Sequence, residues 1–250
     1  MAAALAALTL LCPLFACEAP SEPAGTVTGK RIAFTFDDGP TPVVTDKILS
    51  KIEELGGRVT FFQVANRHDY VSASTYERIA ELGCEIGTHT FSHPSNFTSM
   101  SESATREQLT KSVNAIEEEW GRNVRLFRPV GGSATQSQLK LAAEMGLHTV
   151  NWSLDTEDWR GATSNVDEAE DFIEEKVRYI VNNAEDGDII LMHELYLSSY
   201  EIFARAAEEL VERGYQLVTV SEMLGITDKT KPVAKIQKKG EPFLISDAVG

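Results

Sequence analysis

Thr35-Phe36-Asp37-Asp38-Gly39-Pro40 decides the fold, because this stretch ends the first strongly apolar segment of the domain. The residues before it, Ile32-Ala33-Phe34, predict a buried strand, and the Gly-Pro pair predicts the turn that ends it. Two adjacent carboxylates at the end of a buried strand are unfavourable unless a positive charge compensates them. A metal ion held by one carboxylate would provide that charge and leave the other free for proton transfer.

The chain beyond this strand repeats one pattern of a helix, a glycine and a short strand. Apolar residues at helical spacing between residues 44 and 55 form one helical face, Gly56 ends the helix, and a strand is predicted at 59–62. Such alternation predicts a mainly parallel sheet, and five or more such units in about 200 residues favour a single α/β domain, a complete or distorted (β/α) barrel. The same order precedes the predicted strands 84–86, 124–127, 147–150 and 215–218.

Residues with catalytic chemistry follow the predicted strands. Because the carboxyl ends of parallel strands meet at one face of a barrel, we expect these side chains to share one site. The residues are Asp37 and Asp38, His89 and His93, Arg128, Asp155, Asp158 and Trp159, and His193, which follows an apolar strand at 188–191.

His89 and His93 are four residues apart, which places both rings on one side of a helical turn. Together with one carboxylate they would form a metal site with open coordination positions, as metal-assisted hydrolysis requires. The alternative is a pair of capping or core histidines around Pro94. The acid pair and the other polar loops favour the metal site.

Five segments taken in order resemble the motifs of the polysaccharide deacetylases, also called NodB-homology proteins or carbohydrate esterase family four. The resemblance covers about residues 31–224. It implies a distorted (β/α) barrel and a metal-dependent hydrolase that removes acetyl groups from chitin, peptidoglycan or xylan. The segments are TFDDGP (35–40), THTFSH (88–93), RPVGG (128–132), DTEDW (155–159) and LMH (191–193).

The resemblance also implies a role for each matched polar residue. The metal, Zn²⁺ or else Co²⁺ or another divalent ion, would be held by Asp38, His89 and His93. Asp37 would be the general base toward the metal-activated water, and His193 the general acid toward the leaving group. Of the remaining two, Arg128 would orient Asp37, and Asp158 would hydrogen-bond His193.

The substrate groove is where this sequence departs from the family. Val130 and Gly131 stand where the third motif usually has Pro and Tyr, so the backbone N–H of Gly131 remains to serve the oxyanion while a side chain is missing. Trp159 and Leu191 would wall the slot for the acetyl methyl. Glu194 follows the last motif where Asp is common, a difference expected to have little effect.

The expected activity is removal of acetyl groups from an N-acetylated cell-wall or chitin-type polysaccharide. Two alternatives stay open. An O-deacetylase of acetyl-xylan would use the same chemistry with a different groove. A catalytically silent glycan-binding module would share the fold, although retention of Asp37 and His193 argues against it.

The ends of the chain predict an extracytoplasmic protein. Residues 1–17 are almost wholly apolar and predict a secretory leader, and Leu14-Phe15-Ala16-Cys17 resembles a lipoprotein cleavage box with Cys17 as the lipidated residue. Free secretion is the alternative. A linker (18–29), the deacetylase domain (30–226) and a Lys-rich tail (227–250) would follow. A net charge of −15 argues against nucleic-acid partners and leaves a lipid anchor as the expected membrane contact.

Several reactive or aromatic residues outside the motifs are expected to have structural roles. For Asp155, loop capping and a role in the site are both open. The others are His68 in a solvated loop, His148 in a strand, Trp120 and Trp152 in packing, and Cys84 as a small buried residue.

Overall fold

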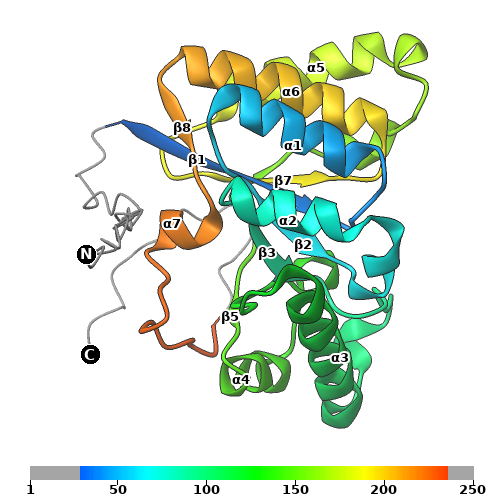
Figure 1. Ribbon diagram of the computed structural model, residues 1–250, viewed down its shortest axis with the longest axis vertical. Coiled ribbons are helices and arrows are strands. Elements are labelled where there is room, and N and C mark those ends of the chain that lie inside the picture. The colour runs from blue at the N-terminus through cyan, green and yellow to red at the C-terminus, as the bar shows by residue number, and fades with distance from the viewer. Residues whose placement is uncertain (1–28, 236–250) are drawn as a thin grey trace, which may run out of the picture.

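Strand β1 (Lys30–Asp37) lies at the centre of a parallel, eight-stranded sheet in the computed structural model, which describes residues 29–235 (Figure 1). The strand order is β5-β4-β3-β2-β1-β7-β6, and β8 pairs with the first part of β1. The predicted leader, the linker up to residue 28 and residues 236–250 of the tail lie outside the described part of the chain. The other strands are β2 (Thr60–Gln63), β3 (Glu85–Thr88), β4 (Leu126–Phe127), β5 (His148–Thr149), β6 (Leu154–Asp155), β7 (Ile189–His193) and β8 (Tyr215–Leu217).

The sheet curls because its two edges are neighbours in the chain. Only residues 150–153 separate β5 from β6, so these edge strands lie at most about 18 Å apart, the reach of five extended residues. Within residues 29–235 no ladder joins them, which makes the barrel incomplete. The predicted distorted (β/α) barrel in a single α/β domain is therefore confirmed.

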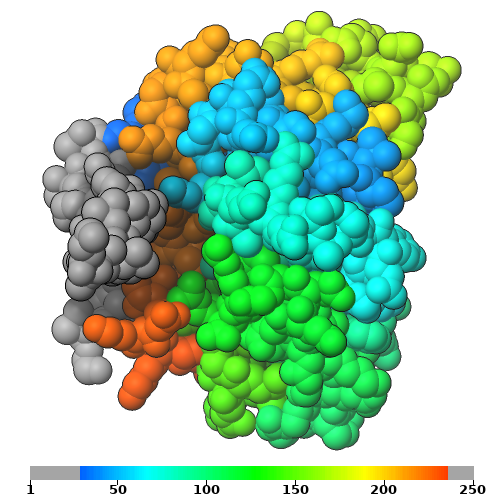
Figure 2. Space-filling view, viewed as in Figure 1, coloured from blue at the N-terminus to red at the C-terminus, as the bar shows by residue number. Residues whose placement is uncertain are grey.

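Helices cover the outer surface of this sheet. In Figure 1, α1, α5 and α6 gather at one end of the molecule, and α3 and α4 at the other. Figure 2 shows that α1, α2 and α3 form a continuous face over the strands. None of the helices within residues 29–235 has the length and hydropathy needed to cross a membrane. The helices are α1 (Val44–Leu55), α2 (Ala73–Glu81), α3 (Glu102–Trp120), α4 (Gln136–Glu144), α5 (Glu170–Asn183), α6 (Leu197–Glu212) and α7 (Val220–Leu224).

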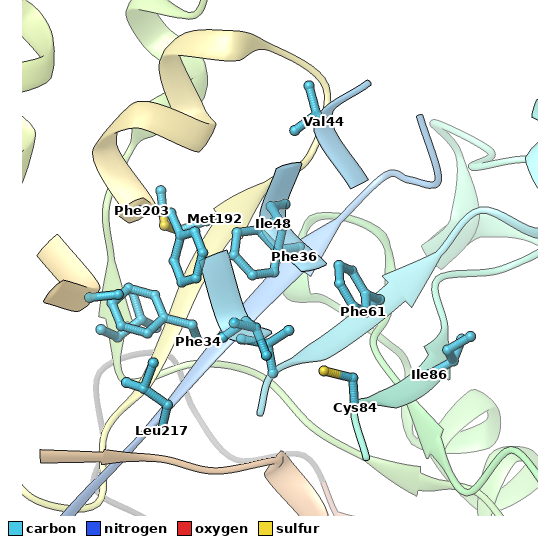
Figure 3. Close-up of a cluster of buried hydrophobic side chains, with 14 of the residues drawn as sticks. Phe34, Phe36, Val44, Ile48, Phe61, Cys84, Ile86, Met192, Phe203 and Leu217 are labelled. Atoms are coloured by element: carbon cyan, nitrogen blue, oxygen red, sulfur yellow. The ribbon is translucent and has the colours of Figure 1, made fainter. Parts of the chain in front are cut away.

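Alternation along β1 separates the hydrophobic core from the barrel interior. Phe34 and Phe36 point outward and pack against Phe203 of α6 at ring-centroid distances of 5.2 and 5.0 Å (Figure 3). Because successive strand side chains point to opposite faces, Thr35 and Asp37 point into the barrel. The sequence of β1 therefore packs the outer helices with one face and presents Asp37 to the interior with the other.

Strand lengths differ from the predictions in the second half of the barrel. Strand β4 begins at Leu126 rather than at residue 124, and β6 was not predicted as a separate strand. Strand β6 pairs over two residues only, and its flanks Ser153 and Asp155 are polar, so no apolar run marks it. Cys84 is buried directly before β3, and burial raises its thiol pKa to about 11, which fits its expected structural role.

Candidate active site

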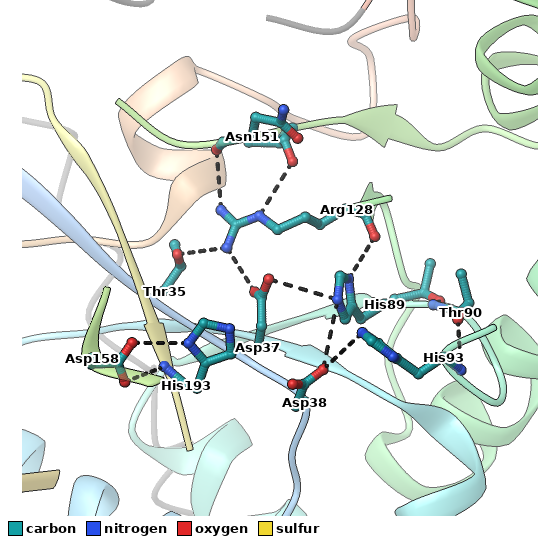
Figure 4. A network of polar contacts seen from close by, with 12 residues as sticks. Thr35, Asp37, Asp38, His89, Thr90, His93, Arg128, Asn151, Asp158 and His193 are labelled. Atoms are coloured by element: carbon teal, nitrogen blue, oxygen red, sulfur yellow. Dashed lines mark hydrogen bonds and ion pairs between the residues drawn. The ribbon is translucent and has the colours of Figure 1, made fainter. Parts of the chain in front are cut away.

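The loops that follow β1, β3, β4, β6 and β7 bring the predicted polar residues together at the carboxyl ends of the strands. In Figure 4, Asp37 and Asp38 lie in the middle, with His89 and His93 on one side and His193 and Asp158 on the other. Strand register accounts for part of this arrangement, because Asp37 of β1 is paired with His193 of β7. The fold brings these residues close together, as predicted, and the role of each residue stays a prediction.

Asp38, His89 and His93 each offer one ligand atom, and these atoms lie within 4.8 Å of one another. The Nε2 atom of His93 is 3.3 Å from Asp38 Oδ1, and that of His89 is 3.7 Å from it. Two ligands at about 2.1 Å from a tetrahedral zinc ion stand roughly 3.4 Å apart, so the spacing fits such an ion.

The hydrogen bonding of these three residues also fits a metal site. His89 Nδ1 donates to the carbonyl oxygen of Arg128 at 2.7 Å, which leaves the lone pair on Nε2 free to bind a cation. Asp38 Oδ1 is buried and accepts no hydrogen bond from the described residues. A buried carboxylate oxygen without a donor is unfavourable unless a cation faces it.

Backbone strain is concentrated at the candidate metal ligands. Asp38, Thr90 and His93 have φ values of 73°, 73° and 53°, which non-glycine residues rarely adopt. Such conformations cost about 1–3 kcal/mol each and persist only where the surroundings hold them. Here Arg67 Nη1 donates to the carbonyl oxygen of Asp38, and Thr90 Oγ1 accepts from the backbone N–H of His93.

Asp37 is buried and is held by Arg128, which is completely buried. The Nη1 atom of Arg128 donates to Asp37 Oδ1 at 2.7 Å and to Thr35 Oγ1 at 2.8 Å, while Nη2 donates to the carbonyl oxygen of Asn151 at 3.1 Å. Its guanidinium also lies 4.0 Å from the ring centre of Phe62. With Oδ1 bound to Arg128, Oδ2 of Asp37 faces the candidate metal ligands, 3.8 Å from His89 Nε2.

His193 is held by Asp158, a completely buried carboxylate. The ring Nδ1 of His193 donates to Asp158 Oδ1 at 2.9 Å, and the backbone N–H of His193 donates to Oδ2 at 3.0 Å. Burial lowers the pKa of His193, but the hydrogen bond and negative charge of Asp158, with Asp37 and Asp38, outweigh burial and raise the pKa to about 9. The ring is therefore protonated at neutral pH, as a general acid must be.

The residues predicted to contact substrate have different environments. Gly131 has a φ of 62° and open space where a side chain would be, whereas a side chain on Gly132 would collide with Trp152. Leu191 is buried in the inner core, two residues before His193. Trp159 is half exposed beside Asp158, with the Arg160 guanidinium 4.6 Å from its ring centre.

Two residues of the site were not singled out from the sequence, and the effect of a third, Glu194, was underestimated. Arg67 and Asn151 hold Asp38 and Arg128 through hydrogen bonds, and Glu194 is completely buried against Gly39. The position of Arg67 just after the predicted strand 59–62 was a usable signal, since every other site loop follows a strand. Asn151 contributes its backbone carbonyl, which no side-chain pattern reveals.

The other residues outside the motifs have varied environments. His68 lies in the 3-10 helix Ala65–Tyr70 rather than in a solvated loop, and its partly buried ring pairs with Asp69 and Glu119. Asp155 Oδ1 accepts from the backbone N–H of Glu157, so this carboxylate caps its own loop. His148 is half-buried in β5, and burial lowers its pKa.

A curled parallel barrel with carboxylates and imidazoles gathered at the carboxyl ends of its strands is typical of barrel hydrolases. The chain belongs to the polysaccharide deacetylase family: the family's sequence model, described as "Polysaccharide deacetylase", matches residues 24–150. The family suggested by the five motifs is thus confirmed.

The similarity to individual proteins extends over most of the chain. A peptidoglycan-N-acetylglucosamine deacetylase of Bacillus cereus is 35% identical, over 81% of this chain and 95% of that protein. The peptidoglycan-N-acetylmuramic acid deacetylase PdaC of Bacillus subtilis is 33% identical over 82% of this chain, which spans only 41% of PdaC. The solved structure of PdaC superposes with a TM-score of 0.69, at 33% identity, covering 78% of this chain and 90% of that one.

A second solved structure is similar at lower identity. It is a family 4 acetyl xylan esterase from Clostridium thermocellum in complex with a cobalt ion. Its TM-score is 0.71 at 27% identity, covering 83% of this chain and 97% of that chain.

Proposed function

We propose that this protein is a metal-dependent deacetylase that removes acetyl groups from an N-acetylated polysaccharide, with cell-wall peptidoglycan as the first candidate. The observation that carries the proposal is the placement of both Asp37 and His193 beside the Asp38–His89–His93 cluster. The printed names of the relatives from Bacillus cereus and Bacillus subtilis favour peptidoglycan over chitin as the substrate.

Asp38, His89 and His93 would hold the metal, with Zn²⁺ as the first candidate, because two imidazoles and one carboxylate are a common catalytic zinc set. When bound, a divalent cation supplies a Lewis acid that would polarise the acetyl carbonyl and lower the pKa of water to about 7. Co²⁺ is the alternative, supported by the cobalt complex of the acetyl xylan esterase.

The chain's own groups would move the protons. Asp37, with Oδ1 fixed by Arg128, accepts a proton from the attacking water through Oδ2. The backbone N–H of Gly131 stabilises the developing oxyanion. His193, protonated and oriented by Asp158, donates a proton to the departing amine nitrogen. Each proton transfer contributes about 10²–10⁴-fold to the rate.

The groove would accept a polymer between exposed loops. Trp159 and Leu191 lie next to Asp158 and His193, where they could limit the acyl pocket to an acetyl methyl. The open space at Gly131 would admit a substituent that a tyrosine would exclude. That space is the observation that favours the second candidate, an O-deacetylase of acetyl-xylan. A silent glycan-binding module is the least supported, because base and acid are both present.

Residues 30–226 would form the catalytic domain of an extracytoplasmic protein, with membrane contact only through a lipid on Cys17. The cell-wall substrates in the names of the relatives support this location. Labelling cells with a palmitate analogue would test the anchor, and the absence of label on a chain carrying Cys17 would favour free secretion.

The test of the activity is release of acetate by the purified zinc-loaded chain from peptidoglycan fragments, chitin oligomers and acetyl-xylan. We expect acetate from peptidoglycan fragments or chitin oligomers, and none from an Asp37→Asn variant. Zinc binding without acetate release from any of these glycans would contradict the proposal, and release from acetyl-xylan alone would establish the second candidate.

A further inference from the structure

Glu194 follows His193 directly, and its side chain is completely buried among the loops of the candidate active site. Its Oε2 atom accepts a hydrogen bond from Thr45 Oγ1 at 2.8 Å, whereas Oε1 has no hydrogen-bond partner within residues 29–235. A carboxyl that is inaccessible to water and only half satisfied is unfavourable in itself. The unfavourable burial of the Glu194 carboxyl therefore indicates that this side chain has a function.

The carboxyl of Glu194 lies against the turn that carries the metal ligand. A Cβ atom added to Gly39 would be 1.5 Å from Glu194 Oε1 and 1.9 Å from its Cδ, so the carboxyl fills the space above this glycine. Gly39 follows Asp38, whose strained φ of 73° needs outside support. The carboxyl thus packs on the residue next to the strained ligand.

Hydrogen bonds extend this packing into a clamp. Glu194 donates its backbone N–H to the carbonyl oxygen of Asp37 at 3.2 Å and accepts on its own carbonyl from Thr41 Oγ1 at 2.6 Å. The backbone N–H of Thr41 in turn donates to Thr45 Oγ1, the group that donates to the Glu194 carboxyl. The first turn of α1, the β1–α1 turn and the β7–α6 turn are therefore linked through this one residue.

The charge state suits a packing role. Burial raises the pKa of Glu194 to about 8, and the nearby negative charges of Asp38 and Asp37 act in the same direction. A neutral carboxyl at this position does not repel Asp37 and Asp38. The negative charge of these two aspartates therefore remains available to attract a cation.

We propose that Glu194 is a positioning residue that clamps the end of β1 and the turn after it, which carry Asp37 and Asp38, to the end of β7, which carries His193. The clamp sets the distances between the proton acceptor, the metal ligand and the proton donor. The part of the proposal that concerns proton transfer rests on the proposed function, whereas the part that concerns the metal ligand does not. Misplacement of a catalytic group by about 1 Å can lower a rate about 10²-fold, so a clamp of this kind matters.

The test compares Glu194→Gln with Glu194→Ala in the full chain. Zinc affinity is measured by competition with a chromophoric chelator, and kcat and KM with an acetylated glycan oligomer. Glu194→Gln keeps the length of the side chain and an acceptor oxygen for Thr45, so we expect both zinc affinity and kcat within about threefold of the wild type. For Glu194→Ala we expect zinc affinity weakened about tenfold or more, as for other groups that orient metal ligands, and kcat lowered with little change in KM.

Glu85→Ala is the matched control, because Glu85 is also a buried carboxyl but lies at the amino end of β3, away from the candidate active site at the carboxyl ends of the strands. Its carboxyl is bound to Ser221 and Thr60. It should lower the melting temperature without changing zinc affinity. Equal zinc affinities for Glu194→Ala and Glu85→Ala would overturn the proposal. So would a Glu194→Gln variant as impaired as Glu194→Ala, since a required charge rather than a clamp would then be at work.

Thr45→Val tests the clamp from the other side and decides the matter if Glu194→Ala does not fold. It removes the donor to Glu194 at nearly constant volume, so zinc affinity should fall in the same direction, and an unchanged affinity would contradict the clamp. If the wild type binds zinc but releases no acetate, the proposed function fails while the zinc comparison among variants still answers the question about Glu194.

Discussion

The negative charge of Asp37 is balanced by Arg128, a residue that has no access to water. Arg128 is completely buried, and besides Asp37 it donates to Thr35 Oγ1 and to the backbone carbonyls of Val150 and Asn151. A buried guanidinium with each donor group engaged is rigid, and it fixes one oxygen of Asp37 while the other stays available. Through the same contacts Arg128 stabilises the barrel interior, in addition to being part of the site.

Replacing Asp37 with Asn should separate catalysis from metal binding. The amide keeps the shape of the side chain but cannot accept a proton, so we expect a rate lowered about 10²-fold or more at unchanged zinc affinity. The measurement is kcat alongside a chelator competition with zinc. Asp38→Asn is the paired control, which should lose zinc; if both variants lost zinc equally, Asp37 would be a ligand rather than the base.

Asp158→Asn should move the alkaline limit of activity to lower pH. In the proposed mechanism His193 acts in its protonated form, so its pKa of about 9 predicts activity that falls as the pH rises through 9. Without the Asp158 carboxylate the ring loses a hydrogen bond and a neighbouring negative charge that raise its pKa, while burial continues to lower it. We therefore expect the alkaline limb of kcat/KM to shift by more than about one pH unit, measured over pH 5–10, whereas a limb that did not move would assign the limit to another group.

The same pKa shift predicts how stability depends on pH. A folded-state pKa above the unfolded value stabilises the protein fully below about 6.5, and this stabilisation is lost as the pH rises through about 9. The difference in unfolding free energy between wild type and Asp158→Asn should thus shrink from pH 6 to pH 10. Urea unfolding at the two pH values measures it.

At the scale of elements, the repeated helix–glycine–strand units can be predicted from the sequence, whereas a very short strand cannot. The glycines before most of the strands and the acids at the end of β1 locate the barrel and its catalytic face, because both follow from general rules of βα units. Strand β6 spans only Leu154 and Asp155 and takes its place from pairing with β7, which no local pattern encodes. Glu194 was underestimated for a related reason, since its burial against Gly39 depends on two loops that are 155 residues apart.

The loop from Val130 to Gly132 offers a prediction at this scale. A side chain on Gly131 meets open space and only the strain of its positive φ, so Gly131→Ala should destabilise the fold by about 1 kcal/mol. A Cβ atom on Gly132 would lie 2.7 Å from the Trp152 ring, so Gly132→Ala adds a collision to the same strain and should lower stability by about 1–3 kcal/mol more. Urea unfolding of both variants checks the order, and equal losses would mean that the loop moves freely away from Trp152.

At the scale of the whole molecule, a metal ion bound by Asp38, His89 and His93 would link the turn after β1 to the loop after β3. Asp38 comes from the turn after β1, whereas His89 and His93 come from the loop after β3, and two of these three ligands have a strained backbone. A ligand that binds only the folded state stabilises it by RT ln(1 + [L]/Kd), about 4 kcal/mol at a thousandfold excess over Kd. For a domain of this size that corresponds to roughly 8–16 °C in melting temperature.

Removal of the metal with a chelator should therefore lower the melting temperature by about 10 °C, and zinc should restore it. His93→Asn should abolish the zinc-dependent rise while leaving the metal-free protein nearly as stable as the wild type, because the half-exposed His93 ring packs little core surface. The stabilisation should also fade below about pH 6, since the imidazoles must be neutral to bind and burial already lowers the pKa of His93. A melting temperature that ignored zinc in the wild type, or that responded equally in His93→Asn, would show that the cluster of Asp38, His89 and His93 is not where the ion binds.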